Sequence, residues 1–268
     1  MQPERPNVYT ARNPAVEVHD LTVSYHEKPV LWGIDFTLPS GSLTGIIGPN
    51  GAGKSTLIKL IMGLIKPASG YVLIHGQPQA KMRKQISYVP QRESVDWDFP
   101  VTAREVVLMG RYPHLGLFRR PSKRDRQIAE ACLEKVGMLD YGSRQIGQLS
   151  GGQQQRVFIA RALAQQAEVY FMDEPFAGVD AATQNTIFQL LTEMKQEGKT
   201  VVVVHHDLQS VEAYFNWVVL LNLRLIASGP TEKVFANELL QETYGGRLTL
   251  LAKAGELMAQ QRFPTREG

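Results

Sequence analysis

The sequence contains one cysteine, Cys132, and little excess charge of either sign. A single cysteine cannot form an internal disulfide, which excludes the small secreted folds that bridges hold together. The 268 residues include 29 Lys+Arg and 26 Asp+Glu, so the formal net charge is +3. This mildly basic balance does not indicate a nucleic-acid partner, and we expect none.

Long hydrophobic runs are also missing. The longest apolar-rich stretch, Trp217 to Ala227, is interrupted by Asn222 and Arg224, and it is shorter than the roughly 18 residues that indicate a membrane span. The first residues contain several prolines and no apolar core of a signal peptide. Hydrophobic residues make up 43% and charged residues 21% of the chain, which excludes a disordered or fibrous protein. These observations favour a soluble, cytoplasmic chain.

The middle of the chain has the pattern of an α/β domain with a helical insert. Strands are expected at 16–25, 29–39, 43–48, 71–76 and 86–90, with a helix at about 54–64. From about 92 to 165 the pattern is helical, and Thr102, Ser122 and Ser150 have the positions of helix caps. Strands at 169–172, 201–204 and 217–222 then alternate with helices at about 181–196 and 207–215. Residues 1–15 and 248–268 are predicted to be tails.

A glycine-rich loop follows the strand at 43–48. Residues 48–55 fit the phosphate-loop pattern G-x-x-x-x-G-K-[ST], between a strand and a helix. Glycines let successive backbone N–H groups surround a phosphate, and the helix dipole adds to the attraction. Lys54 is expected to reach the β- and γ-phosphates, and the Ser55 hydroxyl to bind Mg²⁺. The predicted nucleotide-binding residues here are Gly48, Pro49, Asn50, Gly51, Ala52, Gly53, Lys54, Ser55 and Thr56.

Two carboxylates end the apolar strand VYFMDEP at 169–175. Beside a phosphate loop, the first carboxylate is placed to hold Mg²⁺ through water, and we assign this role to Asp173. Glu174 is then the candidate general base that polarises the attacking water.

The segment Leu149-Ser150-Gly151-Gly152-Gln153 opens the next helix. With this segment, the chain over about residues 16–245 resembles the ATP-binding cassette (ABC) ATPases, whose signature is LSGGQ. The resemblance implies a P-loop NTPase (RecA-like) α/β core, an N-terminal antiparallel β subdomain and an all-helical insert. It implies one ABC ATPase domain at 16–247, with the insert at about 92–165, and ATP and Mg²⁺ as cofactors.

The other motifs of the family occur in the family's order. Tyr25 lies where the family has an aromatic side chain that stacks on adenine. Gln91 matches the Q-loop glutamine, a ligand of Mg²⁺ as well as a catalytic residue, and Asp180 matches the D-loop aspartate. His206 matches the switch histidine, although His205 stands where the family usually has Ser or Thr. Adjacent residues on a strand point to opposite faces, so we expect only one of these histidines to face the phosphate.

The resemblance also implies a head-to-tail homodimer with two ATP molecules at its interface. In this family, the signature helix faces the nucleotide of the partner subunit. Five residues are therefore expected to act in trans: Ser150, Gly151, Gly152, Gln153 and Asp180.

The segment SVDWDFP at 94–100 and the later GRY and RRP triplets resemble the ATPases of manganese, zinc and iron importers. The resemblance implies a peripheral subunit at the cytoplasmic face of the cell membrane, docked on a separate permease and served by an extracytoplasmic solute-binding protein. The segment GRYPHLG also resembles the ATPases of siderophore, haem and cobalamin importers, which is the alternative. Aromatic side chains are candidate permease contacts or core residues of the insert: Trp97, Phe99, Tyr112 and Phe118.

Two other functional classes fit the sequence less well. A cassette protein that acts on nucleic acid or ribosomes usually has further domains that are missing here. A regulatory protein without turnover has little need of a general base, and Glu174 together with His206 argues against it.

Overall fold

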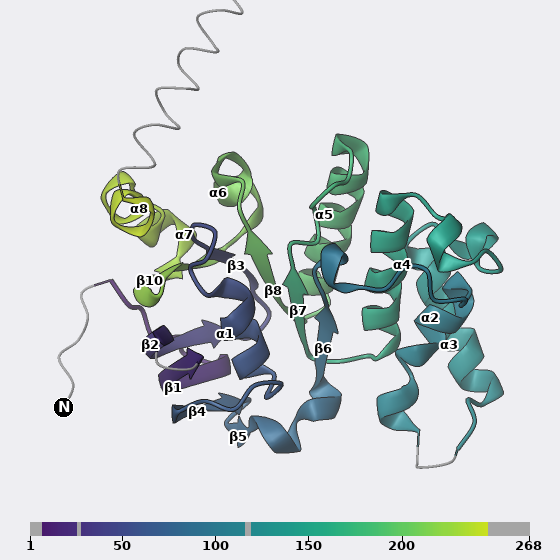
Figure 1. Cartoon of the computed structure of the whole chain (residues 1–268), viewed down its shortest axis with the longest axis horizontal. Coiled ribbons are helices and arrows are strands. Elements are labelled where there is room, and N and C mark those ends of the chain that lie inside the picture. The colour runs from purple at the N-terminus through teal and green to yellow at the C-terminus, as the bar shows by residue number, and fades with distance from the viewer. Residues whose placement is uncertain (1–6, 26–27, 116–118, 246–268) are drawn as a thin grey trace, which may run out of the picture.

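The computed structural model describes residues 7–25, 28–115 and 119–245, and it has two β-sheets with helices on either side (Figure 1). The smaller sheet is antiparallel, with the order β2-β1-β4-β5. Its strands are β1 (Pro14–Tyr25), β2 (Lys28–Pro39), β4 (Ser69–Ile74) and β5 (Gln77–Pro78). This is the N-terminal antiparallel β subdomain that the family resemblance implies.

The larger sheet has six strands in the order β10-β9-β3-β8-β7-β6. These are β3 (Leu43–Ile47), β6 (Ile86–Val89), β7 (Val169–Asp173), β8 (Thr200–His205), β9 (Trp217–Asn222) and β10 (Arg224–Pro230). Neighbouring strands are parallel except at the β9–β10 edge. The carboxyl ends of five strands therefore meet along one edge of the sheet, where ligands of α/β proteins bind.

Helices cover both faces of this sheet, because its strands are apolar on both sides. Val201 and Val203 belong to one core cluster, whereas Val202 and Val204 belong to the other. Helix α1 (Lys54–Ile61) lies between the two sheets and buries Leu57 and Ile58 there. On the opposite face lie α5 (Ala181–Gln196) and α6 (Val211–Tyr214). The P-loop NTPase fold predicted from the motifs is confirmed.

The chain between β6 and β7 forms a helical layer at one end of the molecule (Figure 1). Its helices are α2 (Ala103–Met109), α3 (Lys123–Lys135) and α4 (Gly151–Ala164). Thr102, Ser122 and Ser150 each cap their helix in a reciprocal box with the residue three positions later. The three predicted helix starts are therefore confirmed.

Other parts of the chain differ from the sequence prediction. The segment 92–102 was expected to be helical but forms only a 3₁₀ turn, Arg92–Ser94, before α2. The predicted helix at 207–215 is a 3₁₀ turn, Leu208–Ser210, followed by the single turn α6. Other elements were not predicted, among them the two-residue strand β5, strand β10, α7 (Thr231–Val234) and α8 (Asn237–Tyr244).

Near the N-terminus, Tyr9 donates its backbone N–H to the Ser228 carbonyl oxygen at 2.7 Å and so lies beside β10. The predicted domain limits, 16–247 with an insert at about 92–165, stay predictions. None of the helices in the described ranges combines the length and apolarity needed to cross a membrane.

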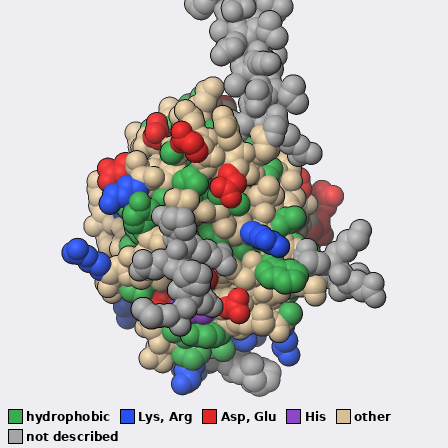
Figure 2. All heavy atoms as spheres, turned by 90° about the vertical axis from the view of Figure 1, so that its left-hand side faces the viewer, with side chains coloured by type: hydrophobic (Ala, Val, Ile, Leu, Met, Phe, Trp, Pro, Cys, Tyr) green, Lys and Arg blue, Asp and Glu red, His purple; other side chains and the backbone are tan. Residues whose placement is uncertain are grey.

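The end of the molecule that is nearest to β2 and α8 carries a mixed surface. Figure 2 shows acidic, basic and hydrophobic side chains scattered over this face, with no broad area of one charge.

Candidate nucleotide-binding site

Four sequence motifs meet at the carboxyl edge of the large sheet. The phosphate loop follows β3, and His206 follows β8. Asp173 ends β7, Glu174 comes directly after it, and Gln91 lies two residues beyond β6. Because β3, β8, β7 and β6 are consecutive neighbours in the sheet, motifs as far apart in the sequence as Gly48 and His206 are brought to one edge of the sheet. The topology brings the predicted catalytic residues together.

The phosphate loop encloses the Lys54 side chain. The Lys54 Nζ atom donates to the carbonyl oxygens of Gly48 at 2.8 Å and Pro49 at 2.9 Å. Gly53, the last residue before α1, has φ +92°, a left-handed conformation that favours glycine. Burial lowers the pKa of Lys54, while the nearby carboxylates of Glu174 and Asp173 act in the opposite direction. The loop therefore holds the Lys54 amine close to the N-terminus of α1.

The loop rests on the turn between β9 and β10. Leu223 donates its N–H to the Ala52 carbonyl oxygen at 3.0 Å. At Gly48, a Cβ atom would meet the main-chain carbonyl oxygen of Leu221. Glycine is required at this position because two main chains approach closely. Leu221 and Leu223 support the site, and no sequence motif marks them.

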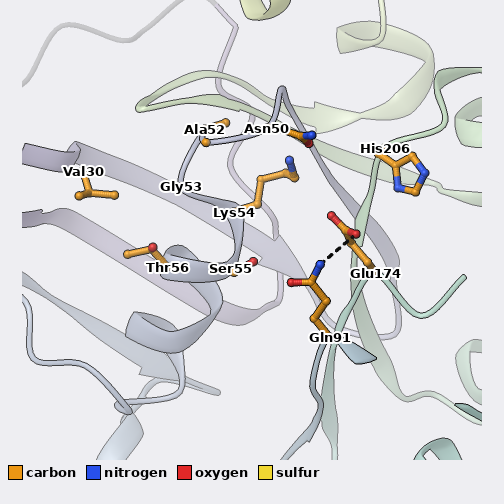
Figure 3. Close-up of a pocket in the computed structure, with 11 residues that line it drawn as sticks. Val30, Asn50, Ala52, Gly53, Lys54, Ser55, Thr56, Gln91, Glu174 and His206 are labelled. Carbon is orange, nitrogen blue, oxygen red and sulfur yellow. Dashed lines mark hydrogen bonds between the residues drawn. The ribbon is translucent and has the colours of Figure 1, made fainter. Parts of the chain in front are cut away.

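A cavity of about 540 Å³ opens beside the loop (Figure 3). Lys54 lies on one side of it, and Gln91, Glu174 and His206 lie on the other. Gln91 Nε2 donates to Glu174 Oε2 at 3.4 Å. The predicted site residues that line the cavity are Asn50, Gly51, Ala52, Gly53, Lys54, Ser55, Thr56, Gln91, Glu174 and His206. Gly48 and Pro49 contribute through their carbonyl contacts with Lys54.

Glu174 has an unusual backbone conformation, with φ +51°. A non-glycine residue in the left-handed region costs about 1–3 kcal/mol, and such residues concentrate at functional sites. The turn directs the Glu174 side chain toward the cavity that also holds Lys54 (Figure 3). This geometry is suitable for a general base beside a phosphate.

Asp173 is the last residue of β7 and is 2% exposed. Its Oδ1 atom is buried and finds no hydrogen-bond partner in the part of the chain that the structure describes. Burial raises the pKa of Asp173, and a hydrogen bond with the Ser55 side chain opposes this effect. An unpartnered carboxylate oxygen beside a hydroxyl fits a divalent cation with oxygen ligands, so the pair is suited to hold one.

Two further residues near the site belong to none of the predicted motifs. Val30 of β2 lines the cavity. Tyr88 of β6 pairs in register with Phe171, which puts it near Asp173 two residues later. Burial, which has the larger effect, and the nearby Asp173 carboxylate together raise the pKa of Tyr88 to about 12. The position of Tyr88 near Asp173 depends on the register between β6 and β7. The sequence pattern of one strand does not reveal how it pairs with another.

The residues expected to act in trans do not line this cavity. Ser150 is exposed and caps α4, with its Oγ atom accepting from Gln153 N at 3.4 Å. Asp180 caps α5, where its Oδ1 atom accepts from Thr183 N at 2.9 Å. A Cβ atom on Gly152 would lie 3.2 Å from the Thr183 side chain, so the signature and D-loop segments are neighbours. They form a second polar surface, apart from the residues that line the cavity.

The remaining sequence candidates are placed as follows. Tyr25 ends β1, and its predicted adenine contact lies outside the described side chains. Trp97 packs against Phe158 of α4 with ring centroids 5.0 Å apart, so it belongs to the insert's core. Phe99 and Tyr112 are more than half exposed. Phe118 lies outside the described residues.

Comparisons with known proteins agree with the motifs. A family model described as ABC transporter matches residues 31–177. The manganese transport system ATP-binding protein MntB of Bacillus subtilis (strain 168) is 64% identical over 236 residues, which cover 88% of this chain and 94% of the relative. The zinc transport system ATP-binding protein TroB of Treponema pallidum (strain Nichols) is 57% identical over 235 residues, with 88% of each chain covered.

A solved structure of a metal-chelate type ABC transporter in an inward-facing conformation has the same fold. Its TM-score is 0.77 at 31% identity, and the match covers 86% of this chain and 88% of the other. The cassette family predicted from LSGGQ and the phosphate loop is confirmed. The chain belongs to the ABC transporter family and is an ATP-binding subunit of that family.

Proposed function

We propose that this protein is the ATP-hydrolysing subunit of an importer for a transition-metal ion such as manganese, zinc or iron. The observation that carries the proposal is the cavity that has Lys54 on one side and Glu174 with His206 on the other. The similarity of the whole chain to manganese and zinc transport ATP-binding proteins supports a transition-metal ion as the cargo. The ion itself is expected to pass through a separate membrane permease.

The proposed chemistry uses positioning and charge. The N–H groups of the phosphate loop and the Lys54 ammonium bind the β- and γ-phosphates, and Glu174 accepts the proton of the attacking water. His206 donates a hydrogen bond toward the γ-phosphate as negative charge develops there. Tyr25 stacks on the adenine.

Three side chains are proposed to hold Mg²⁺: the Ser55 hydroxyl, the Gln91 amide and the Asp173 carboxylate. The unpartnered Oδ1 atom of Asp173 supports this assignment. When bound, Mg²⁺ would neutralise charge on the phosphate oxygens.

The site is proposed to be completed by a second copy of the chain. Ser150, Gly151, Gly152, Gln153 and Asp180 do not line their own cavity among the described residues, and Ser150 is solvent-exposed. A helix N-terminus attracts anions, so this surface suits the γ-phosphate bound by a partner. Two copies arranged head to tail around two ATP molecules would satisfy both surfaces at once.

The proposed location is the cytoplasmic face of the cell membrane, where the dimer binds two permease subunits and an extracytoplasmic solute-binding protein delivers the ion. Phe99 and Tyr112 are exposed aromatic side chains of the insert and are candidates for the permease contact.

An importer of metal chelates, such as siderophores, haem or cobalamin, is the alternative cargo class. The match to the structure of a metal-chelate type ABC transporter favours it. Uptake of radioactive manganese and of iron–siderophore by cells that lack the gene would separate the two classes. Loss of manganese uptake alone supports the metal-ion importer, and loss of chelate uptake alone contradicts it.

Affinity purification from detergent-solubilised membranes of the host tests the transport role. We expect the tagged protein to carry a polytopic permease with it. Recovery of ribosomes or nucleic acid without any membrane protein would overturn the importer proposal.

A further inference from the structure

His205 is a buried histidine directly next to the candidate switch histidine. It ends β8 and is 4% exposed, whereas the following residue, His206, is exposed and lines the cavity. Neighbouring residues of a strand point to opposite faces, so the two rings cannot share one task. The His205 ring therefore faces away from the cavity and into the protein interior.

A chain of hydrogen bonds joins His205 to the turn after His206. The His205 Nε2 atom lies 2.7 Å from Ser210 Oγ, and Ser210 Oγ donates to Asp207 Oδ2 at 2.8 Å. Because the single hydroxyl proton is used toward Asp207, the serine oxygen accepts from the Nε2–H of His205. Burial lowers the pKa of His205 to about 4, so the ring is neutral near pH 7 and carries one N–H.

Asp207 also fixes the turn from within, since its Oδ1 atom accepts from Gln209 N at 3.0 Å. The segment from 205 to 210 is thus tied at both of its ends, with His206 between them. The loop that follows a strand would otherwise have several accessible conformations, and each would place His206 differently.

Aromatic rings enclose the other sides of His205. Phe176, two residues after Glu174, meets it edge-on at 5.4 Å between ring centroids, and Phe215 lies at 5.4 Å as well. Phe176 stacks on Phe188 of α5 at 4.0 Å. The His205 ring therefore contacts the segment that carries Glu174 and is bonded to the turn after His206.

We propose that His205 is a positioning residue that fixes His206 relative to Glu174, through its hydrogen bond to Ser210 and its contact with Phe176. This inference rests on the proposed role of His206 in hydrolysis. A displacement of about 1 Å in a catalytic group can reduce a rate by around a hundredfold. Loss of this anchor is therefore expected to slow hydrolysis without weakening ATP binding, because the phosphate loop is built on β3 and α1.

The test compares steady-state ATPase kinetics of purified full-length variants. Ser210→Ala removes the hydrogen-bond acceptor and keeps the His205 ring, and we expect kcat to fall by about tenfold with KM for ATP within about twofold. His205→Phe keeps the aromatic packing but loses the N–H donor, so its kcat should fall as much as that of Ser210→Ala. His205→Asn, which retains an N–H donor, should recover part of the rate. Ser69→Ala, an exposed serine of β4, is the matched control and should keep the wild-type kcat.

Coupling to His206 gives the readout that a merely structural role would not change. If His205 acts through His206, the double variant Ser210→Ala with His206→Ala is no slower than His206→Ala alone. A wild-type kcat in Ser210→Ala, beside a large loss in His206→Ala, would overturn the positioning role only. A wild-type kcat in His206→Ala would overturn the proposed role of the switch histidine and the positioning role with it.

Discussion

At the residue scale, Lys54 shows how the fold concentrates charge at one point. Its ammonium is held by two loop carbonyl groups and lies near the carboxylates of Glu174 and Asp173. Burial makes this positive charge costly, and a bound polyphosphate would stabilise it further. We therefore propose that nucleotide affinity depends strongly on Lys54.

Replacing Lys54 with alanine should abolish ATP binding. The variant removes the cation and its two hydrogen bonds, and we expect Kd to rise by at least about a hundredfold. Isothermal titration calorimetry with ATP measures this directly. Lys59→Ala, on an exposed position of the same helix, is the control. Wild-type affinity in the Lys54 variant would contradict the assignment of the phosphate loop.

Much of the site could be predicted from short sequence motifs, because the residues of the phosphate loop and of LSGGQ are contiguous and their geometry is local. The strand alternation also separated His205 from His206, and the structure places His206 at the cavity. The support from Tyr88, Leu221 and Leu223 could not be predicted, since it depends on which strands are neighbours. The role of His205 likewise depends on Ser210 and Phe176, which only the folded chain brings to it.

At the scale of the elements, the helical insert is held by a buried arginine. Arg111 donates from Nε to Asp125 Oδ1 of α3 at 3.0 Å, and from Nη1 to the Ala164 carbonyl oxygen at the end of α4 at 2.7 Å. One guanidinium thus joins the segment after α2 to both other helices of the layer. Removing one partner of a buried pair leaves an uncompensated charge.

Arg111→Ala should destabilise the protein by about 3 kcal/mol, because the Asp125 Oδ1 atom and the Ala164 carbonyl oxygen lose the guanidinium inside the insert. Arg104→Ala is the matched control, since its ion pair with Glu130 is exposed and 3.5 Å long. We expect it to change stability by less than about 1 kcal/mol. Urea unfolding followed by circular dichroism gives both values, and equal effects of the two variants would contradict the anchoring role.

The elements that were predicted correctly carry a local signal, and those that were missed do not. Thr102, Ser122 and Ser150 are side-chain caps, whereas the N-cap residue of α8, Ala236, makes no side-chain hydrogen bond. Strand β10 has a register shift between Leu225 and Ala227, which interrupts the period-two pattern. In the segment 92–102, Pro100 disfavours the helical conformation of Phe99, and the Trp97 ring bonds the Arg92 carbonyl group instead.

At the scale of the whole molecule, the cavity and the surface formed by the signature and D-loop segments are separate parts of one chain. The cavity gathers the phosphate loop, Gln91, Glu174 and His206, whereas the signature and D-loop residues lie outside its lining. Neither surface completes a hydrolytic site alone under the proposed function. ATP is then expected to join two copies, and hydrolysis to release them.

The most direct test of this account is the mass in solution of Glu174→Gln with and without Mg-ATP, measured by light scattering after size-exclusion chromatography. The variant keeps the binding residues but lacks the base, so we predict a stable dimer with ATP, a monomer without it, and very slow turnover. A variant that binds ATP with full affinity yet stays monomeric, or that hydrolyses ATP at the wild-type rate, would contradict the account.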